Sequence, residues 1–246
     1  MDMEKIARLQ QMVDESKRIV FFGGAGVSTE SGIPDFRSVD GLYNQKYDYP
    51  PEQILSHTFF MRMRSEFYRF YYDKILVDGV EPNAAHKVLA KLEEIGKLTA
   101  IVTQNIDGLH QKAGSKNVLE VHGSVLSNTC MSCGKKFDLD YMMKQKEAGN
   151  LEPVCDKCGG VIKPDVVLYE EGLDQDILSE SVRQIASADM LIVGGTSLVV
   201  YPAAGLIDYY RGNKLVLINK SQTAKDSGAD LIISDSIGKV LSQLKL

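Results

Sequence analysis

The chain has 246 residues and lacks tryptophan, an excess of positive charge and any long apolar run. Its longest apolar stretches, such as residues 190–193 and 215–218, are far shorter than the ~20 residues that span a bilayer, so no membrane partner is expected. Lys and Arg total 28 against 33 Asp and Glu, and the net charge of −5 disfavours nucleic acid as a partner, because phosphate binding needs basic residues. Residues 1–10 mix charged with apolar side chains, unlike a secretion signal, which predicts a cytoplasmic protein.

Cysteine is scarce, and all four cysteines lie in two C-x-x-C pairs. None is left to form a disulfide elsewhere, which favours a reducing compartment and a metal site. A spacer of about 20 residues between two such pairs is typical of a closed four-thiolate zinc site, whose role is structural because no position stays open for water. Each pair taken alone is also compatible with a redox dithiol. The predicted zinc ligands are Cys130, Cys133, Cys155 and Cys158.

The content of 44% hydrophobic and 25% charged residues, with only 7 Pro, is that of a globular protein. Short, continuously apolar runs are typical of parallel strands that are covered on both faces. Helical spacing of apolar residues between these runs predicts an α/β fold with a doubly wound, parallel, Rossmann-like sheet. The predicted strands are residues 18–22, 98–103, 117–121, 166–168, 190–193, 215–218 and 231–233, and the predicted helices include residues 3–13, 84–95, 174–186 and 237–244.

Two segments break the alternation of strands and helices. Residues 41–83 are rich in aromatic side chains at helical spacing, which we interpret as packing, and residues 127–161 hold the cysteines. We expect the two segments to form a smaller domain, a helical insertion with a zinc module, and to leave a cleft against the sheet. The larger, nucleotide-binding domain is then made of residues 1–40, 84–126 and 162–246.

Small and hydroxyl-bearing residues follow the first predicted strand. Glycines at positions 24 and 26 break the strand, and Ser28 and Thr29 open a short helix, an order suited to a pyrophosphate. The ordinary dinucleotide fingerprint would place a third glycine where Thr29 stands and an acidic residue at the end of a second strand. The chain has neither, which disfavours a hydride-transferring dehydrogenase.

Polar groups also follow four of the predicted strands. Ligands of doubly wound sheets bind outside the carboxyl ends of the strands, so groups that are distant in sequence are expected to converge there. These groups are Gln104-Asn105-Ile106-Asp107, His122-Gly123, Gly195-Thr196-Ser197 and Asn219-Lys220. Together they predict a binding site, although each alone is compatible with an ordinary turn.

The four histidines have different settings. His57 and His86 lie in or beside helical segments, where packing or capping is the expected role, and His110 follows Asp107 in a turn or helix. His122 ends an apolar strand directly before a glycine, where an imidazole can face the cleft. Its ordinary pKa of about 6.5 suits proton exchange at neutral pH. The surroundings of His122 are equally compatible with a catalytic and a structural role.

These motifs resemble those of the sirtuin family, in the family's order and over nearly the whole chain. The residues that carry the resemblance are Gly24-Ala25-Gly26-Val27-Ser28, Gly32-Ile33-Pro34-Asp35-Phe36-Arg37, Gln104-Asn105-Ile106-Asp107, His122-Gly123, the cysteine pairs, Gly195-Thr196-Ser197-Leu198 and Pro202-Ala203-Ala204. The resemblance implies an NAD-dependent protein lysine deacetylase, which transfers the acetyl group to ADP-ribose and releases nicotinamide and O-acetyl-ADP-ribose. It implies NAD as co-substrate, one structural zinc ion, and acetylated lysine side chains of proteins as partners.

The resemblance also assigns roles to single residues. It implies His122 as the general base, with Asn105 and Asp107 as further catalytic residues. The implied NAD contacts are Ala25, Thr29, Phe36, Arg37, Gln104, Asn105, Ile106, Asp107, His122, Thr196, Ser197, Asn219, Lys220 and Ile237. An extended substrate peptide is implied between two strand edges, one with Val166, Val167 and Tyr169 and the other with Leu198 and Val199.

The resemblance also implies an acyl preference, because one motif in the aromatic-rich segment of residues 41–83 differs from that of some family members. Family members that prefer succinyl or malonyl lysine carry Tyr-x-x-Arg, and the equivalent residues here are Tyr68-Arg69-Phe70-Tyr71, without Arg at the last position. The resemblance therefore implies acetyl or longer apolar acyl groups.

Two further residues depart from the family. Gly23 stands where Thr is usual, and Glu170 stands where Gly is usual. Because a glycine often marks a close backbone approach, Glu170 is expected to weaken peptide binding or to bias it by charge. The competing functions are a sensor of NAD or ADP-ribose, an ADP-ribosyltransferase or NAD glycohydrolase on the same scaffold, and a zinc-ribbon nucleic-acid module.

Overall fold

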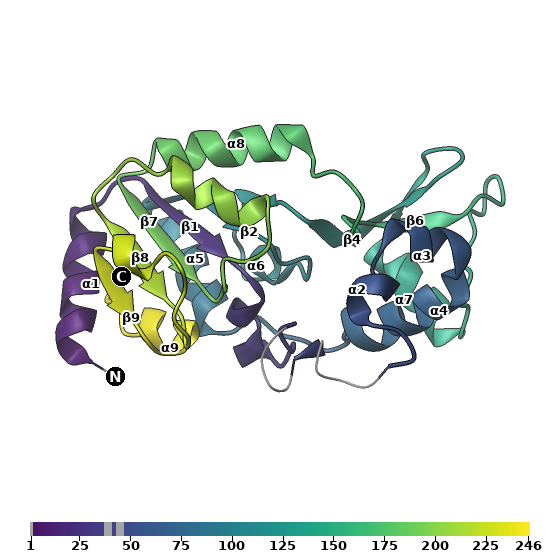
Figure 1. The fold of residues 1–246 in the computed structure, drawn as a ribbon, viewed down its shortest axis with the longest axis horizontal. Helices are drawn as coiled ribbons and strands as arrows, with labels where there is room; N and C mark the ends of the chain where they lie inside the picture. The colour runs from purple at the N-terminus through teal and green to yellow at the C-terminus, as the bar shows by residue number, and fades with distance from the viewer. Residues whose placement is uncertain (1, 37–40, 43–46) are drawn as a thin grey trace.

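The computed structural model describes residues 2–36, 41–42 and 47–246, and it has a large and a small lobe (Figure 1). The large lobe contains a six-stranded sheet with the order β3-β2-β1-β7-β8-β9, in which every pairing is parallel. The predicted doubly wound α/β architecture is confirmed. The strands are β1 (Ile19–Gly23), β2 (Leu98–Thr103), β3 (Val118–Glu120), β7 (Met190–Gly194), β8 (Leu215–Ile218) and β9 (Leu231–Ile233).

Helices cover both faces of this sheet because alternate strand residues point to opposite sides. Ile19 and Phe21 of β1 pack in one core with residues of α1 (Met3–Glu15), α5 (Ala84–Glu94) and α9 (Ile237–Leu241). Val20 and Phe22 pack in a second core with residues of α8 (Gln175–Ala186) and the 3₁₀ segment η5 (Ala203–Tyr209). No helix in the described part of the chain is long and apolar enough to cross a membrane.

The small lobe is built on a three-stranded antiparallel sheet with the order β5-β4-β6. Its strands are β4 (Gly123–Cys130), β5 (Lys136–Asp138) and β6 (Ile162–Val166). The aromatic residues of the helical insertion are buried against this sheet in one core, as the interpretation of their spacing required. The helical segments are α2 (Pro51–Ile54), α3 (His57–Arg62), α4 (Arg64–Phe70), the π-helical turn η4 (Tyr71–Ile75) and α7 (Leu139–Glu147).

The assignment of residues 166–168 to the parallel sheet is wrong. Val166 ends β6 and pairs antiparallel with Gly123 of β4. Burial alternates along β6 because the helical insertion covers one face of the small sheet. A short apolar run does not specify which sheet it joins. The small sheet therefore extends across both predicted domain boundaries, 126/127 and 161/162.

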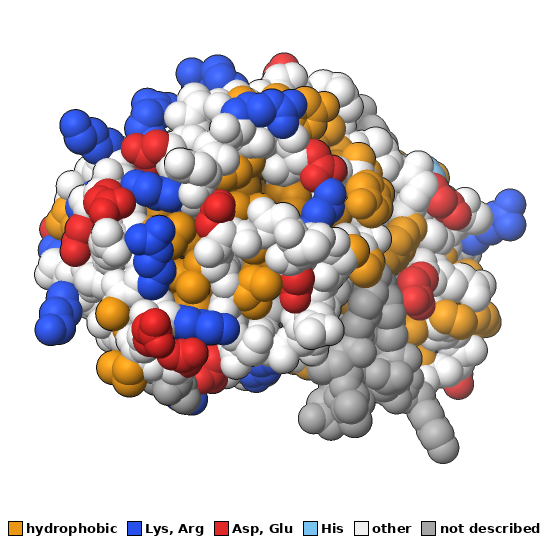
Figure 2. Space-filling model, turned by 60° about the vertical axis from the view of Figure 1, so that its left-hand side comes forward, with side chains coloured by type: hydrophobic (Ala, Val, Ile, Leu, Met, Phe, Trp, Pro, Cys, Tyr) orange, Lys and Arg blue, Asp and Glu red, His pale blue; other side chains and the backbone are white. Residues whose placement is uncertain are grey.

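Charged side chains on the surface are mixed in sign. On the face shown in Figure 2, Lys and Arg are interspersed with Asp and Glu.

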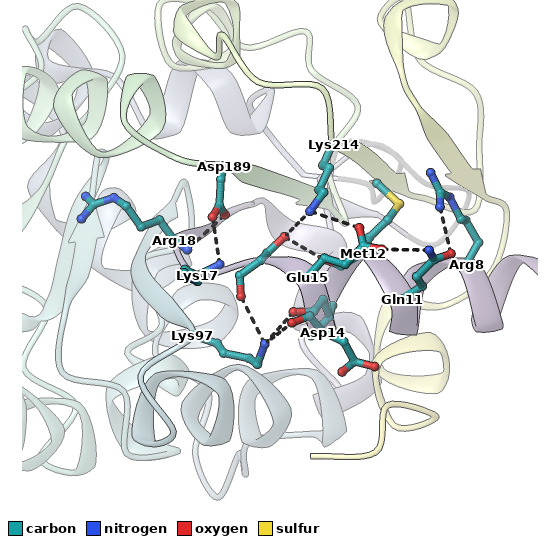
Figure 3. Close-up of polar contacts among 12 residues, drawn as sticks. Arg8, Gln11, Met12, Asp14, Glu15, Lys17, Arg18, Lys97, Asp189 and Lys214 are labelled. Carbon is teal, nitrogen blue, oxygen red and sulfur yellow. Dashed lines mark hydrogen bonds and ion pairs between the residues drawn. The ribbon is translucent and has the colours of Figure 1, made fainter.

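At the amino ends of the parallel strands, a polar network holds the end of α1 (Figure 3). The last turn of α1 contains no basic residue, and Lys97, which precedes β2, supplies the missing donor. Its Nζ donates to the carbonyls of Val13, Asp14 and Ser16 at 2.8, 2.9 and 3.1 Å. Helix ends leave carbonyls without intrahelical donors, so one ammonium group satisfies three acceptors here.

Lys97→Met is expected to lower the free energy of unfolding by about 2 kcal/mol, because charge-assisted hydrogen bonds are lost from a partly buried site. The melting temperature, measured by calorimetry, should fall by roughly 4 to 8 °C. The matched control is Lys91→Met, which removes only the exposed pair with Glu94. Equal melting temperatures for the two variants would contradict this role of Lys97.

Candidate functional site

The turn after β1 approaches the turn after β7 at backbone contact distance. The Gly26 N–H donates to the Gly195 carbonyl at 2.8 Å. A Cβ at Gly26 would lie 2.8 Å from the Gly195 Cα, and a Cβ at Gly195 would lie 2.4 Å from the Val27 nitrogen. Neither position accepts a side chain. The glycines therefore bring two strand ends together and leave open backbone for a ligand.

A hydroxyl joins the first strand end to the second. Ser28 Oγ donates to Asp107 Oδ2 at 2.6 Å and accepts from Asn105 Nδ2 at 3.0 Å. The other carboxylate oxygen of Asp107 accepts the Leu109 N–H at 2.9 Å. Sequence reasoning placed the Ser28 hydroxyl beside a pyrophosphate, but the structure buries it between Asn105 and Asp107. Its function here is to orient the two predicted catalytic side chains.

The ends of β2, β7 and β8 are linked in the same way. Gln104 Nε2 donates to Thr196 Oγ1 at 3.0 Å, and the Thr196 N–H donates to Asn219 Oδ1 at 3.0 Å. The Nδ2 group of Asn219 is buried and has no partner among the described residues. A buried donor of this kind needs a ligand or water, which fits a predicted nucleotide contact.

His122 lies at the carboxyl edge of the sheet between β3 and β4. Its Nδ1 lies 3.1 Å from the Gln104 carbonyl oxygen. Because a carbonyl only accepts, Nδ1 carries the proton, and Nε2 keeps a free lone pair. Burial lowers the pKa of His122 from 6.5, and the bond to Gln104 partly opposes this shift. The imidazole is thus neutral at pH 7 and is available as a base.

Of the other histidines, His86 has the capping and packing role expected of it, whereas His57 contacts a carboxylate. His86 accepts the Asn83 N–H in a capping box at the start of α5. It packs edge-on against His110, with 4.7 Å between ring centroids. Burial lowers the pKa of His86 to about 4 and that of His110 to about 3, so both rings stay neutral. His57 contacts Glu171 at 2.8 Å through Nδ1.

The remaining predicted nucleotide contacts differ in accessibility. Thr29 is half-buried and donates to the Gly26 carbonyl at 3.0 Å, and Ile106 packs against the small-lobe core. The Ile237 side chain is only 3% exposed and covers Gly194, so its main chain is the part available to a nucleotide. Ala25 and Phe36 are half-buried, Ser197 and Lys220 are exposed, and Arg37 lies outside the described residues.

The predicted peptide edge after β6 is largely occupied by internal hydrogen bonds. The Val167 N–H donates to the His122 carbonyl at 2.9 Å, and the N–H and carbonyl of Tyr169 bond to Leu55 and His57. Within the described chain, the Val167 carbonyl and both backbone groups of Glu170 have no hydrogen-bond partner. The available edge therefore reaches one residue beyond the predicted segment. The backbone of Glu170 has a φ of 77°, the left-handed conformation that favours glycine.

The opposite edge is open at Val199, which is 55% exposed. Leu198 before it is buried and has a φ of 56°. The Leu198 N–H donates to Thr196 Oγ1, which ties this edge to the nucleotide contacts. Nothing in the sequence indicated the positive φ of Leu198.

Comparison with known proteins shows the family of this chain. Residues 24–202 match the Sir2 family. The chain belongs to the Sir2 family. It is 65% identical to the NAD-dependent protein deacetylase of Clostridium acetobutylicum, over 97% of each chain, and 59% identical to that of Clostridium perfringens, over 98% of each chain. Among solved structures, one described as "Structural Basis for the Mechanism and Regulation of Sir2 Enzymes" has a TM-score of 0.89 at 40% identity, covering 98% of this chain and 96% of the other. The structure "Sir2-p53 peptide-NAD+" has a TM-score of 0.86 at 40% identity, covering 99% and 97%.

The four cysteines of this Sir2-family chain form one cluster at the far end of the small sheet. Their Sγ atoms all lie within 4.8 Å of one another, with Cys130 and Cys158 at 3.5 Å and Cys133 and Cys155 at 3.7 Å. Four sulfurs around a zinc ion with bonds of about 2.3 Å are roughly 3.8 Å apart, so the cluster fits the ion. The first cysteine of each pair is buried and the second is exposed.

Purified protein is expected to contain one zinc ion per chain, and Cys133→Ser should lose it, because three thiolates bind zinc more weakly than four. Zinc content is measured by mass spectrometry and small-lobe folding by limited proteolysis within residues 127–161. Ser132→Ala, at the exposed neighbouring position, is the control and should keep the metal. A Cys133→Ser variant with full zinc content would show that this cysteine is not a ligand.

Proposed function

We propose that this protein is an NAD-dependent protein deacetylase that transfers the acetyl group of acetyl-lysine to ADP-ribose and releases nicotinamide and O-acetyl-ADP-ribose. The observation that carries the proposal is the position of His122, a half-buried, neutral imidazole with a free Nε2, held by the Gln104 carbonyl next to the network of Ser28, Asn105 and Asp107. The deacetylase names of relatives that are 58 to 65% identical support it. The free thiols required by the zinc site support a location in the cytoplasm.

The carboxyl edge of the parallel sheet would hold NAD. When bound, NAD supplies an electron-poor ribose carbon that the acetyl-lysine oxygen can attack. Asp107, fixed by Ser28, would hold the nicotinamide end, and the unpartnered Nδ2 of Asn219 would donate to the adenosine side. Because the reacting oxygen is a weak nucleophile, most of the task is positioning the two substrates. Ala25, Thr29, Phe36, Arg37 and the other predicted contacts complete this assignment.

His122 would take a proton from a ribose hydroxyl after the acetyl oxygen has bonded to the sugar. Its Nε2 is free for this step because the Gln104 carbonyl fixes the proton on Nδ1. The substrate peptide would lie extended between the segment after β6 and the exposed edge at Val199. Backbone pairing accounts for recognition with little dependence on side-chain sequence.

His122→Ala is expected to lower kcat for deacetylation by ~10²- to 10⁴-fold, the usual contribution of a general base, with zinc content unchanged. His122→Asn keeps a donor for the Gln104 carbonyl but offers no base, so it should be equally inactive. Products of incubation with NAD and an acetyl-lysine peptide are identified by mass spectrometry. O-acetyl-ADP-ribose is expected, whereas ADP-ribose alone would indicate a glycohydrolase and a modified protein a transferase.

The pH dependence follows from the lowered pKa of His122. The base is active in its neutral form, and burial keeps the ring neutral to lower pH than usual. The acidic limb of kcat/KM, which reports the free enzyme, should therefore lie below 6.5. A pH series with the acetyl-lysine peptide measures it, and His122→Ala is the control that should lose this limb. An acidic limb above 6.5 in the parent protein would contradict the assignment.

The acyl preference is expected to favour acetyl over succinyl lysine by at least about tenfold in kcat/KM. Tyr71 is fully buried against Phe67 and carries no positive charge, while Arg69 pairs with Glu66 on the surface. A succinyl carboxylate would find no cation there and would lose its hydration. Competition between acetyl and succinyl peptides of identical sequence measures the ratio. Comparable rates for the two peptides would contradict the expected preference for acetyl lysine.

A further inference from the structure

Two adjacent carboxylates, Glu170 and Glu171, shape the turn that follows β6. The Leu168 N–H donates to Glu171 Oε2 at 2.9 Å, and the Glu171 N–H donates to the Leu168 carbonyl at 3.0 Å. Lys163 Nζ donates to the same Oε2 at 3.0 Å, and its side chain is only 16% exposed. Residues 168–171, here called the 168–171 turn, are thus closed by a half-buried ion pair.

The 168–171 turn is also joined to residues 55–58, which lead into α3. The Tyr169 N–H donates to the Leu55 carbonyl at 2.9 Å, and the His57 N–H donates to the Tyr169 carbonyl at 3.0 Å. These two bonds form a parallel bridge between Ser56 and Tyr169. The backbone of the turn is therefore attached to the helical insertion at one point.

The side chains of Glu170 and Glu171 add further contacts between the 168–171 turn and residues 55–58. Glu170 Oε2 accepts the Thr58 N–H at 2.8 Å, and Glu171 Oε1 lies 2.8 Å from His57 Nδ1. Hydrogen bonds to Thr58 lower the pKa of Glu170. Burial alone would raise the pKa of Glu171, but hydrogen bonds from His57, Leu168 and Lys163 outweigh it and lower the pKa. Both groups are ionised at neutral pH and are engaged with the protein.

We propose that Glu170 and Glu171 are positioning residues for the acetyl-lysine peptide, and this proposal rests on the deacetylase function proposed above. They clamp the 168–171 turn against residues 55–58, while the Val167 N–H bonds to the His122 carbonyl on the other side. The free N–H and carbonyl of Glu170 are thereby held at one fixed place relative to the base. An extended peptide that pairs with them meets a preorganised edge.

This role differs from the effect expected of Glu170 from the sequence, which was weaker or charge-biased peptide binding. The left-handed backbone there costs a non-glycine residue on the order of 1 kcal/mol, and the bond from Thr58 offsets part of that cost. The carboxylate is directed to the Thr58 N–H, so it contributes to peptide placement rather than to charge selection. Glycine would relieve the backbone but would release the clamp.

The test uses Glu171→Gln and Glu170→Ala in the full chain. Gln removes the negative charge that pairs with Lys163, so the half-buried ion pair that closes the turn is lost. Each variant is expected to raise the KM for an acetyl-lysine peptide, by about tenfold for Glu171→Gln and roughly threefold for Glu170→Ala, with kcat near that of the parent. The NAD dissociation constant, measured by calorimetry, should stay unchanged. Glu94→Gln, which removes an exposed ion pair on α5, is the matched control.

The outcomes separate this inference from the proposed function. A rise in peptide KM without a change in NAD affinity supports the clamp. Unchanged peptide KM, or equal losses for peptide and NAD, overturns it, because the latter pattern indicates general destabilisation. If the parent protein leaves the peptide acetylated, the deacetylase proposal fails, and the clamp is then judged from the peptide dissociation constant measured by fluorescence anisotropy.

Discussion

The rest of the structure depends on the junction between the parallel sheet and the small sheet, where His122 precedes Gly123, the first residue of β4. The His122 ring bonds to the carbonyl that follows β2, and its own carbonyl accepts the Val167 N–H from the segment after β6. Gly123 has a φ of 75°, and a Cβ there would lie 2.0 Å from the Asp165 carbonyl oxygen. Only glycine lets the chain turn at this point. The same turn therefore places the predicted base, the peptide segment and the start of the small lobe.

The small sheet connects the cysteine cluster to this junction. β4 begins at Gly123, beside the predicted base, and ends at Cys130, and its partner β6 begins at Ile162 opposite Cys130 and ends at Val166 opposite Gly123. A zinc ion at one end of these strands would stabilise their pairing at the other end, although it takes no part in the reaction. Under the proposed clamp, the two carboxylates after β6 would hold the peptide side of the junction in a comparable way. Positioning would then be shared between a metal, an ion-pair cluster and backbone pairing.

Three histidines show how surroundings assign different roles to one residue type. His86 of α5 and His110 of α6 (Leu109–Lys112) are buried, and their lowered pKa values keep them neutral as packing groups. His122 is also neutral, but one nitrogen is oriented by a carbonyl and the other has no protein partner among the described residues. The neutral state of the ring alone does not distinguish these cases. The orientation and the location at the strand ends do so.

The sequence alone determined the parallel core, the four-cysteine cluster and the residues that follow each strand. Local patterns carry this information, because continuous apolar runs, cysteine spacing and glycine turns express physical requirements within a few neighbouring residues. The tertiary structure decided what these patterns join. It paired Val166, which was predicted for the parallel sheet, within the antiparallel sheet. It placed Ser28 between Asn105 and Asp107, and it engaged the backbone of Tyr169 in internal hydrogen bonds. These outcomes depend on which distant segment lies opposite each residue, a property that is set only when the whole chain packs.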